Sequence, residues 1–300
     1  MLRRDFLKLT AATSSTLVGG DVLAAEEKPG MDYDKAQGVL VDTTICIGCR
    51  KCEWACNQAN QLPSGDILSF EDKSVFKDHR RPTENAYTVI NTYQDPTLPD
   101  KQRYIKIQCM HCNHPACASA CIVGALKKTE QGTVVYDAWK CMGCRYCMIA
   151  CPFQIPAYEY GNVMAPQVRK CTFCFDRVTK EGKKPGCVEI CPNEALTFGP
   201  RGDLLQLARA RIRQTPGRYI DHIYGEQEAG GTSWMYLAGT EFSGTELPIL
   251  DSRPIPEITE KIQHGVFKAF VPPLVLYGLL ALAMRSFRKD GDGGGNHEGT

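Results

Sequence analysis

The chain has 300 residues, which is enough for one or two domains with a sizeable core. Its 35 basic and 34 acidic residues leave a net charge of +1, so no basic field indicates nucleic acid as a partner. Its 16 cysteines exclude an ordinary globular protein, and every one of them falls into a group of four.

The N-terminal segment has the pattern of a twin-arginine export signal. Arg3 and Arg4 stand near the start and are followed by a mild apolar and small-residue run over 9–22. Small residues suited to cleavage come next, so we predict that 1–25 is a signal peptide. The alternative is an amphipathic N-terminal helix with a chance arginine pair, which the Gly-Gly-Asp run at 19–21 would break.

Two cysteine quartets have the spacing of bacterial ferredoxins, Cys-x2-Cys-x2-Cys-x3-Cys. They are Cys46, Cys49, Cys52 and Cys56, and Cys141, Cys144, Cys147 and Cys151. Three thiolates on a tight loop can ligate three corners of one [4Fe–4S] cubane, while the fourth points away and ligates the cluster of a partner motif. Gly48 and Gly143, each just before the second cysteine, relieve crowding where the backbone approaches the cluster.

The other two quartets are variations of this spacing. They are Cys109, Cys112, Cys117 and Cys121, and Cys171, Cys174, Cys187 and Cys191. The last of these has an insert between its second and third cysteines, Lys- and Gly-rich over 179–186, which must loop out. Asn57 and Ile122 follow the first two quartets, where the pattern usually has proline. Proline is not a ligand, so we predict clusters at these quartets as well.

Disulfides, zinc and an incomplete set of clusters account for the cysteines less well. Disulfides are common in exported proteins with an even cysteine count, but adjacent Cys-x2-Cys pairs make poor staples, and the twin-arginine route carries proteins already folded around a cofactor. Zinc sites use two Cys-x2-Cys pairs, so zinc does not explain the x2-x2-x3 spacing of the cysteines. A lost or [3Fe–4S] cluster would normally show as a missing cysteine, and none is missing. The sequence therefore predicts four [4Fe–4S] clusters.

The segment between the second and third quartets predicts how the quartets pair. Residues 124–126 and 132–137 are typical of strand, turn and strand, as in a compact two-cluster ferredoxin. No such hairpin is evident between the third and fourth quartets, so we expect the middle quartets to form one unit and the outer quartets another. The expected ligand sets are Cys109, Cys112, Cys117 with Cys151; Cys141, Cys144, Cys147 with Cys121; Cys46, Cys49, Cys52 with Cys191; and Cys171, Cys174, Cys187 with Cys56.

The remaining segments predict a scaffold around the cysteines. Within 62–106, strand-like stretches at 87–93 and 104–107 indicate a cover over the clusters or a partner surface. Residues 204–213 predict a basic amphipathic helix that packs on the surface.

Two histidines lie in a cysteine loop. We interpret His111 and His114 as packed or solvent-facing, with tuning of a cluster potential through hydrogen bonds as the alternative. The sequence shows no Ser-His-Asp set, phosphate-binding loop or dinucleotide fingerprint in a convincing context, which indicates a relay without catalytic residues.

The C-terminal region has the pattern of a membrane anchor. Residues 265–284 are apolar apart from Lys268, and about 20 such residues can cross a bilayer. Arg285, Arg288 and Lys289 follow, which predicts a cytoplasmic C-terminus with the preceding domain outside. The alternative is a buried core helix, for which an apolar hairpin partner is missing.

These observations predict five segments along the chain. They are a signal peptide (1–25), a four-cluster double ferredoxin-like domain (26–200), a C-terminal extension or partner contact (201–258), a membrane anchor helix (259–289) and a cytoplasmic tail (290–300).

The whole pattern resembles the four-cluster iron–sulfur subunits of respiratory oxidoreductases. The resemblance rests on the four quartets, the stretches 141–147 and 185–192, the Gly-Gly-Thr stretch at 230–232 and the tail segment. Within that family the chain is most similar to the hydrogenase-2 type of subunit. The beta subunits of formate dehydrogenases share these features but generally travel on the signal of their catalytic partner, so Arg3 and Arg4 favour the hydrogenase type.

The resemblance implies an α+β fold of two pseudo-symmetric ferredoxin-like modules, each with two [4Fe–4S] clusters, followed by a transmembrane helix. It implies the same interleaved ligand sets. It also implies a non-catalytic subunit that relays single electrons between a periplasmic catalytic subunit, a [NiFe] hydrogenase, and a quinone-reactive subunit of the inner membrane. Two alternatives stay open: the beta subunit of a formate dehydrogenase or other molybdopterin oxidoreductase, and a structural zinc or disulfide protein.

Overall fold

The computed structural model describes residues 31–96, 101–257, 259–260 and 278–284. One compact unit comprises Asp32–Lys261, and the account below is of this unit. Of the helices in the described ranges, none is long and apolar enough to cross a bilayer. The predicted signal peptide lies outside the described residues, and so does most of the predicted anchor, of which a helical stretch at 278–284 is described.

A three-stranded sheet is the centre of the unit. Strand β1 (Gln37–Asp42) lies between β8 (Leu196–Pro200), to which it is antiparallel, and β9 (Trp234–Leu237), to which it is parallel. The apolar run from residue 38 to 41 explains the central place of β1, since a strand buried on both faces has no need for alternating polar residues.

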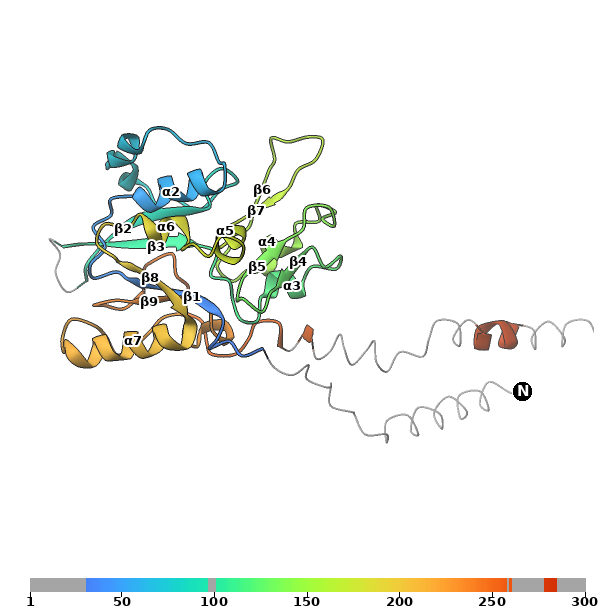
Figure 1. Cartoon of the computed structure of the whole chain (residues 1–300). Coiled ribbons are helices and arrows are strands. Elements are labelled where there is room, and N and C mark those ends of the chain that lie inside the picture. The colour runs from blue at the N-terminus through green and yellow to red at the C-terminus, as the bar shows by residue number, and fades with distance from the viewer. Residues whose placement is uncertain (1–30, 97–100, 258, 261–277, 285–300) are drawn as a thin grey trace, which may run out of the picture. The chain divides into compact units, whose positions relative to one another are not determined.

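The two faces of this sheet contact different parts of the unit. Leu40 and Met235 point to helix α7 (Arg201–Gln214), which lies along the sheet in Figure 1 and packs Leu204 against them. Their neighbours in the strands point to the opposite side, toward the cysteines; these are Val39, Val41, Trp234 and Tyr236. The two-residue period of a strand thus separates a helix-covered face from a cysteine-facing one. The helix predicted at 204–213 is confirmed.

Three two-stranded hairpins complete the strands. They are β2 (Thr88–Gln94) with β3 (Gln102–Gln108), β4 (Leu126–Lys128) with β5 (Val134–Tyr136), and β6 (Ala157–Tyr158) with β7 (Val168–Arg169), all antiparallel. The strands predicted within 62–106 and the hairpin predicted between the second and third quartets are confirmed. The expectation that no hairpin lies between the third and fourth quartets is wrong, because β6 and β7 pair there across a loop whose turn residues hide so short a pairing from the sequence. The segment 201–258 belongs to the same unit, because it supplies both α7 and β9.

Short helices carry five of the 16 cysteines. The helices are α2 (Lys51–Ala59), α3 (Ala116–Ser119), α4 (Tyr146–Ala150), α5 (Phe175–Thr179) and α6 (Gly186–Glu189), with 3-10 turns η1 (Ile67–Glu71), η2 (Ser74–Lys77) and η3 (Glu228–Gly230). Helix α2 packs against α6, and α3 packs against α4. Each contact joins helices from the two quartets that were expected to pair, and the fold is of mixed α and β type, as predicted.

Candidate metal centres

All 16 cysteines lie in the described part of the chain, and none of them forms a disulfide. The structure gathers them into four groups of four, which we call sites A to D. Site A is Cys46, Cys49, Cys52 and Cys191; site B is Cys109, Cys112, Cys117 and Cys151; site C is Cys141, Cys144, Cys147 and Cys121; site D is Cys171, Cys174, Cys187 and Cys56.

Sites A and C each line a cavity. The cavity of site A has an empty volume of about 450 Å³ and contacts Lys106 and Pro192 besides its four cysteines. The cavity of site C, of about 330 Å³, is lined by its four cysteines together with Leu126, Tyr136 and Arg145. In both sites, three cysteines of one quartet meet the last cysteine of another.

Sites B and D are identified by the effect that the charges of neighbouring cysteines have on the pKa of one thiol in each site. Burial holds the pKa of Cys112 well above its usual range, and the charges of Cys151, Cys109 and Cys117 add to this effect. Burial likewise raises the pKa of Cys56, with the charges of Cys171, Cys187 and Cys174 as further causes. These are the neighbours that the interleaved ligand sets require, and a thiolate so placed needs a cation to compensate its charge.

The arrangement fits an iron–sulfur cluster better than zinc. No three of the Cys, His, Asp or Glu side chains in the described ranges lie close enough to share one metal ion. A structural zinc draws four ligands to about 2.3 Å from one ion, whereas the four thiolates of a cubane each bind their own iron and stand further apart. Backbone amides also point at sulfur, as a cluster site favours: Ala125 N donates to Cys121 Sγ at 3.2 Å and Phe173 N to Cys171 Sγ at 3.4 Å.

All four cysteine loops turn in the same way just before their second cysteine. Gly48 and Gly143 have φ of 62° and 75°, in the left-handed region that glycine adopts at little cost. The other two loops keep this turn with His111 at 48° and Phe173 at 57°. These two residues are buried against each other with ring centroids 5.1 Å apart, so packing offsets the backbone strain.

A substitution at Gly48 is expected to disturb site A. A Cβ there would lie 2.3 Å from the ring of Tyr104. Gly182 is the matched control, because its φ of +64° carries the same backbone strain and nothing lies within 4 Å of an added Cβ. We expect Gly182→Ala to cost about 1–2 kcal/mol and to keep full iron, and Gly48→Ala to be less stable and to lose iron. Equal iron per chain in the two variants would contradict this expectation.

His111 is packed rather than exposed. Its Nδ1 accepts a hydrogen bond from Val134 N at 2.9 Å, and burial, reinforced by the charges of Lys170 and Lys128, holds its pKa well below the usual range. The imidazole is therefore neutral in this environment. His114 is less buried and contacts the ring of Tyr33 edge-on. The interpretation of His111 as a packed residue is confirmed.

Sequence reasoning missed a buried cation beside sites A and D. Lys106 is 2% exposed, and its Nζ donates to Thr88 Oγ1 at 2.5 Å and Gln108 Oε1 at 3.1 Å. The same Nζ lies 4.5 Å from the centre of the Trp234 ring. Burial lowers its pKa, but the thiolates of Cys187, Cys52, Cys171 and Cys56 outweigh burial and leave the pKa raised. Alternation along β3 could have shown only that the Lys106 side chain points to the other face of the strand from those of Ile105 and Ile107.

A second buried charge network lies next to site A. Glu53 Oε2 accepts hydrogen bonds from Arg50 and Arg80, and its Oε1 accepts from Arg80 at 2.7 Å and from Ile90 N at 2.7 Å. Glu53 thereby ties helix α2, which carries Cys52 and Cys56, to strand β2.

The segment that precedes β2 covers site A. Arg50 donates to the carbonyl oxygens of Phe70 and Asp72, and Lys73 Nζ donates to Gly48 O at 2.5 Å. Residues 66–77, with η1 and η2, are thus held over the first cysteine loop. The expectation that part of 62–106 covers a cysteine site is confirmed.

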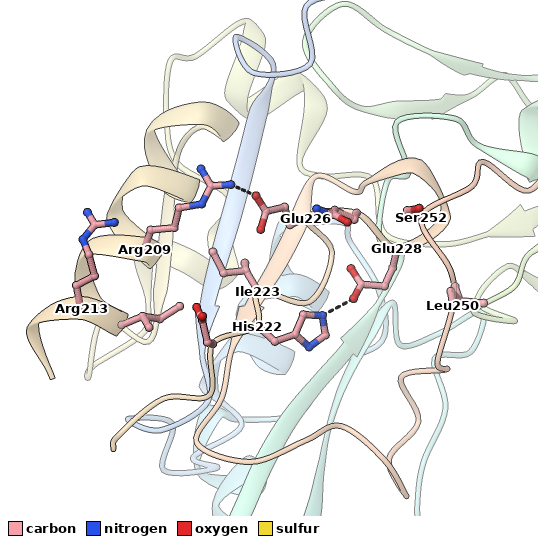
Figure 2. Close-up of a pocket in the computed structure, with 11 residues that line it drawn as sticks. Arg209, Arg213, His222, Ile223, Glu226, Glu228, Leu250 and Ser252 are labelled. Atoms are coloured by element: carbon pink, nitrogen blue, oxygen red, sulfur yellow. Dashed lines mark hydrogen bonds and ion pairs between the residues drawn. The ribbon is translucent and has the colours of Figure 1, made fainter. Parts of the chain in front are cut away.

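Helix α7 and the loop before β9 enclose a pocket that contains no cysteine. Figure 2 shows Arg209 pointing at Glu226 and the ring of His222 at Glu228, with Arg213 further along the helix. His222 Nε2 lies 2.6 Å from Glu228 Oε1, and Arg209 pairs with Glu226. The opposite charges of Arg209 and Glu226 link α7 to the loop before β9.

Comparisons with known proteins agree with this chemistry. Residues 101–201 match the family model of the 4Fe-4S dicluster domain. The chain is 48% identical to a protein of Nitratidesulfovibrio vulgaris over 95% of this chain and 78% of that protein. It is 37% identical to the hydrogenase-2 operon protein HybA of Escherichia coli O157:H7 over 99% of this chain and all of that protein.

A formate dehydrogenase subunit is also similar. The nitrate-inducible formate dehydrogenase iron–sulfur subunit of Escherichia coli K12 is 33% identical over 69% of each chain. Full-length similarity to HybA, the 4Fe-4S domain match and four gathered cysteine groups agree with one another. The chain belongs to the family of ferredoxin-type iron–sulfur subunits of respiratory oxidoreductases that includes HybA and the formate dehydrogenase iron–sulfur subunits.

Proposed function

We propose that sites A to D each hold one [4Fe–4S] cluster and that the chain relays single electrons through them. The observation that carries the proposal is the gathering of all 16 cysteines into four groups with no cysteine left over. When bound, a [4Fe–4S] cluster supplies a one-electron redox centre. Sites A and D would form one ferredoxin-like module around α2 and α6, and sites B and C the other around α3 and α4.

The four sites stand in the series A, D, B, C. Burial is the largest cause of the raised pKa of Cys52, Cys171 and Cys117, and a thiolate of the next site is among the further causes. Cys187 of site D acts on Cys52, Cys109 of site B acts on Cys171, and Cys147 of site C acts on Cys117. A chain of neighbouring sites with two ends suits a relay between two partners.

The chain's own residues would tune the series. Six of the 16 cysteines are buried, backbone amides donate to sulfur, and Lys106 places a positive charge beside sites A and D. The amides and the lysine stabilise negative charge and so raise a reduction potential.

The partners proposed are a catalytic subunit, a [NiFe] hydrogenase, and a quinone-reactive integral membrane subunit. Full-length similarity to a hydrogenase-2 operon protein supports the first, and Arg3 and Arg4 support a periplasmic site at the inner membrane. Similarity to a formate dehydrogenase subunit keeps a molybdopterin partner as the second candidate. In membranes that contain the complex, hydrogen is expected to reduce the clusters. Reduction by formate instead would favour the second candidate.

The decisive test of the relay is the content of iron and acid-labile sulfide in protein purified anaerobically. We expect about 16 of each per chain, from four clusters of four irons, with a brown colour and broad absorbance. A colourless protein that contains stoichiometric zinc and no iron would contradict the relay and indicate a structural protein.

A further inference from the structure

The indole N–H of Trp234 is buried and has no hydrogen-bond partner within the described ranges of the chain. The residue is 1% exposed, and an indole nitrogen can donate a hydrogen bond but cannot accept one. Leaving a buried donor unpaired destabilises the fold, so tryptophans inside folded proteins usually find an acceptor. The N–H of Trp234 therefore calls for an acceptor that is not part of the polypeptide around it.

The other two of the three tryptophans differ from Trp234 in this respect. Trp54 Nε1 donates to Gly65 O at 3.3 Å. Trp139 is 98% exposed, so water reaches its N–H. The chain thus contains two natural controls for an effect of the indole N–H of Trp234.

The ring of Trp234 lies against residues that belong to site D or border it. It contacts the ring of Phe173, which lies between two cysteines of site D, in a T-shaped arrangement with centroids 5.9 Å apart. Lys106 Nζ lies over the face of the ring at 4.5 Å. Lys106 is itself beside three thiolates of site D, those of Cys187, Cys171 and Cys56. Among the four sites, site D is therefore the one whose surroundings the ring shares most.

The backbone of Trp234 fixes the place of the ring. In strand β9 the residue lies opposite Val39 of β1, on the cysteine-facing side of the sheet. Trp234 N also lies 3.3 Å from Met110 O, to which it donates, and Met110 follows Cys109 in the loop of site B. A side chain held by a paired strand loses little further conformational freedom when its N–H forms a hydrogen bond.

We propose that Trp234 Nε1 donates a hydrogen bond to a sulfur of the cluster at site D and thereby raises the reduction potential of that cluster. The inference rests on the proposed relay, because the acceptor belongs to the cluster. A hydrogen bond to sulfur stabilises the more negative, reduced state. Site D precedes site B in the series, so its potential affects the electron step between the two modules.

Tryptophan labelled with ¹⁵N at the indole nitrogen tests the hydrogen bond in the unmodified holoprotein. In protein poised so that site D is reduced, pulsed electron paramagnetic resonance detects a ¹⁵N nucleus that is hydrogen-bonded to the cluster. Cys174→Ser identifies the signal of site D, because exchange of a ligand changes or removes that signal. Since only tryptophan carries the label, the imidazole of His111 does not contribute.

We expect a ¹⁵N coupling on the signal of site D in the unmodified protein. The coupling should remain in Trp54→Phe and Trp139→Phe and be lost in Trp234→Phe, which keeps an aromatic ring and removes the N–H. Redox titration of Trp234→Phe measures the size of the effect. The equilibrium constant for reduction of site D should fall about tenfold, which corresponds to roughly 59 mV for a one-electron couple. Trp139→Phe should leave it unchanged.

Absence of the ¹⁵N coupling from the site D signal of the unmodified protein overturns the proposal and indicates that the N–H binds an ordered water. A coupling that persists in Trp234→Phe, or that belongs only to the signal of another site, overturns it as well. Iron and sulfide measured on the same preparations keep the two hypotheses apart. About 16 irons per chain without the coupling rejects the hydrogen bond and retains the relay, whereas absence of iron rejects the relay itself.

Discussion

Glu53→Ala is expected to lower the thermal unfolding midpoint of the anaerobic holoprotein by roughly 10 °C. The carboxylate of Glu53 is buried and holds Arg50, Arg80 and the backbone N–H of Ile90. Its removal leaves the buried guanidinium of Arg50 without a counter-charge, which typically costs about 3–5 kcal/mol. In a domain of this size, each 1 kcal/mol shifts the midpoint by about 2–4 °C. Differential scanning calorimetry under argon measures the shift.

The matched control is Asp176→Ala. Asp176 pairs with Lys180 at 3.0 Å, but both side chains are more than 70% exposed, and such a pair contributes about 0–1 kcal/mol. Glu53→Gln should fall between the two, because the amide oxygen still accepts from Ile90 N while the charge is lost. A midpoint for Glu53→Ala within about 2 °C of the control would show that Arg50 finds another partner or reaches water.

Lys106→Met is expected to lower the reduction potentials of the clusters at sites A and D by on the order of 100 mV. Lys106 is buried beside the thiolates of Cys187 and Cys52 and makes no ion pair within the described ranges. A positive charge at this place stabilises the added electron, so its removal makes reduction less favourable. Methionine preserves the length and apolar character of the stem, which limits the effect on packing.

Redox titration followed by electron paramagnetic resonance measures these potentials. Lys180→Met is the control, because Lys180 is 72% exposed and solvent screens its charge. The potentials of sites B and C should move less than those of sites A and D. If all four potentials stayed within about 20 mV of the unmodified protein, Lys106 would be neutral or its charge compensated.

The groups of cysteines could be predicted from the sequence because the patterns that indicate them involve residues close together in the chain. The spacing within a quartet predicts a cysteine loop. The hairpin predicted between Gly124 and Asp137 indicates which quartets share a module. Helix α7 was accessible for the same reason, since Leu204 and Ala208 recur at helical spacing and are both buried.

The central sheet was not accessible, because its pairing depends on strands far apart in the chain. Residues 38–41 are too few to show a periodic pattern of apolar residues. No residue near them indicates that β9 is a parallel neighbour of β1. Lys106 and Glu53 were missed for a related reason. Local patterns place charged side chains in water, and only the complete fold shows that Lys106 and Glu53 are buried. The left-handed turn at Phe173 was hidden because a bulky residue rarely adopts a positive φ, and the histidine at position 111 indicates such a turn only weakly.

The place of β1 at the centre of the sheet has a consequence for the order in which the protein assembles on the ribosome. Strand β1 is made first, yet its neighbours β8 and β9 begin at Leu196 and Trp234, and Thr43 Oγ1 bonds to Leu237 O across 194 positions. Bacterial synthesis proceeds at about 10 residues per second, so β1 waits roughly 20 seconds for its partners. Cys46 waits for Cys191 in the same way. The ligand set of site A is therefore complete only when most of the chain has been made.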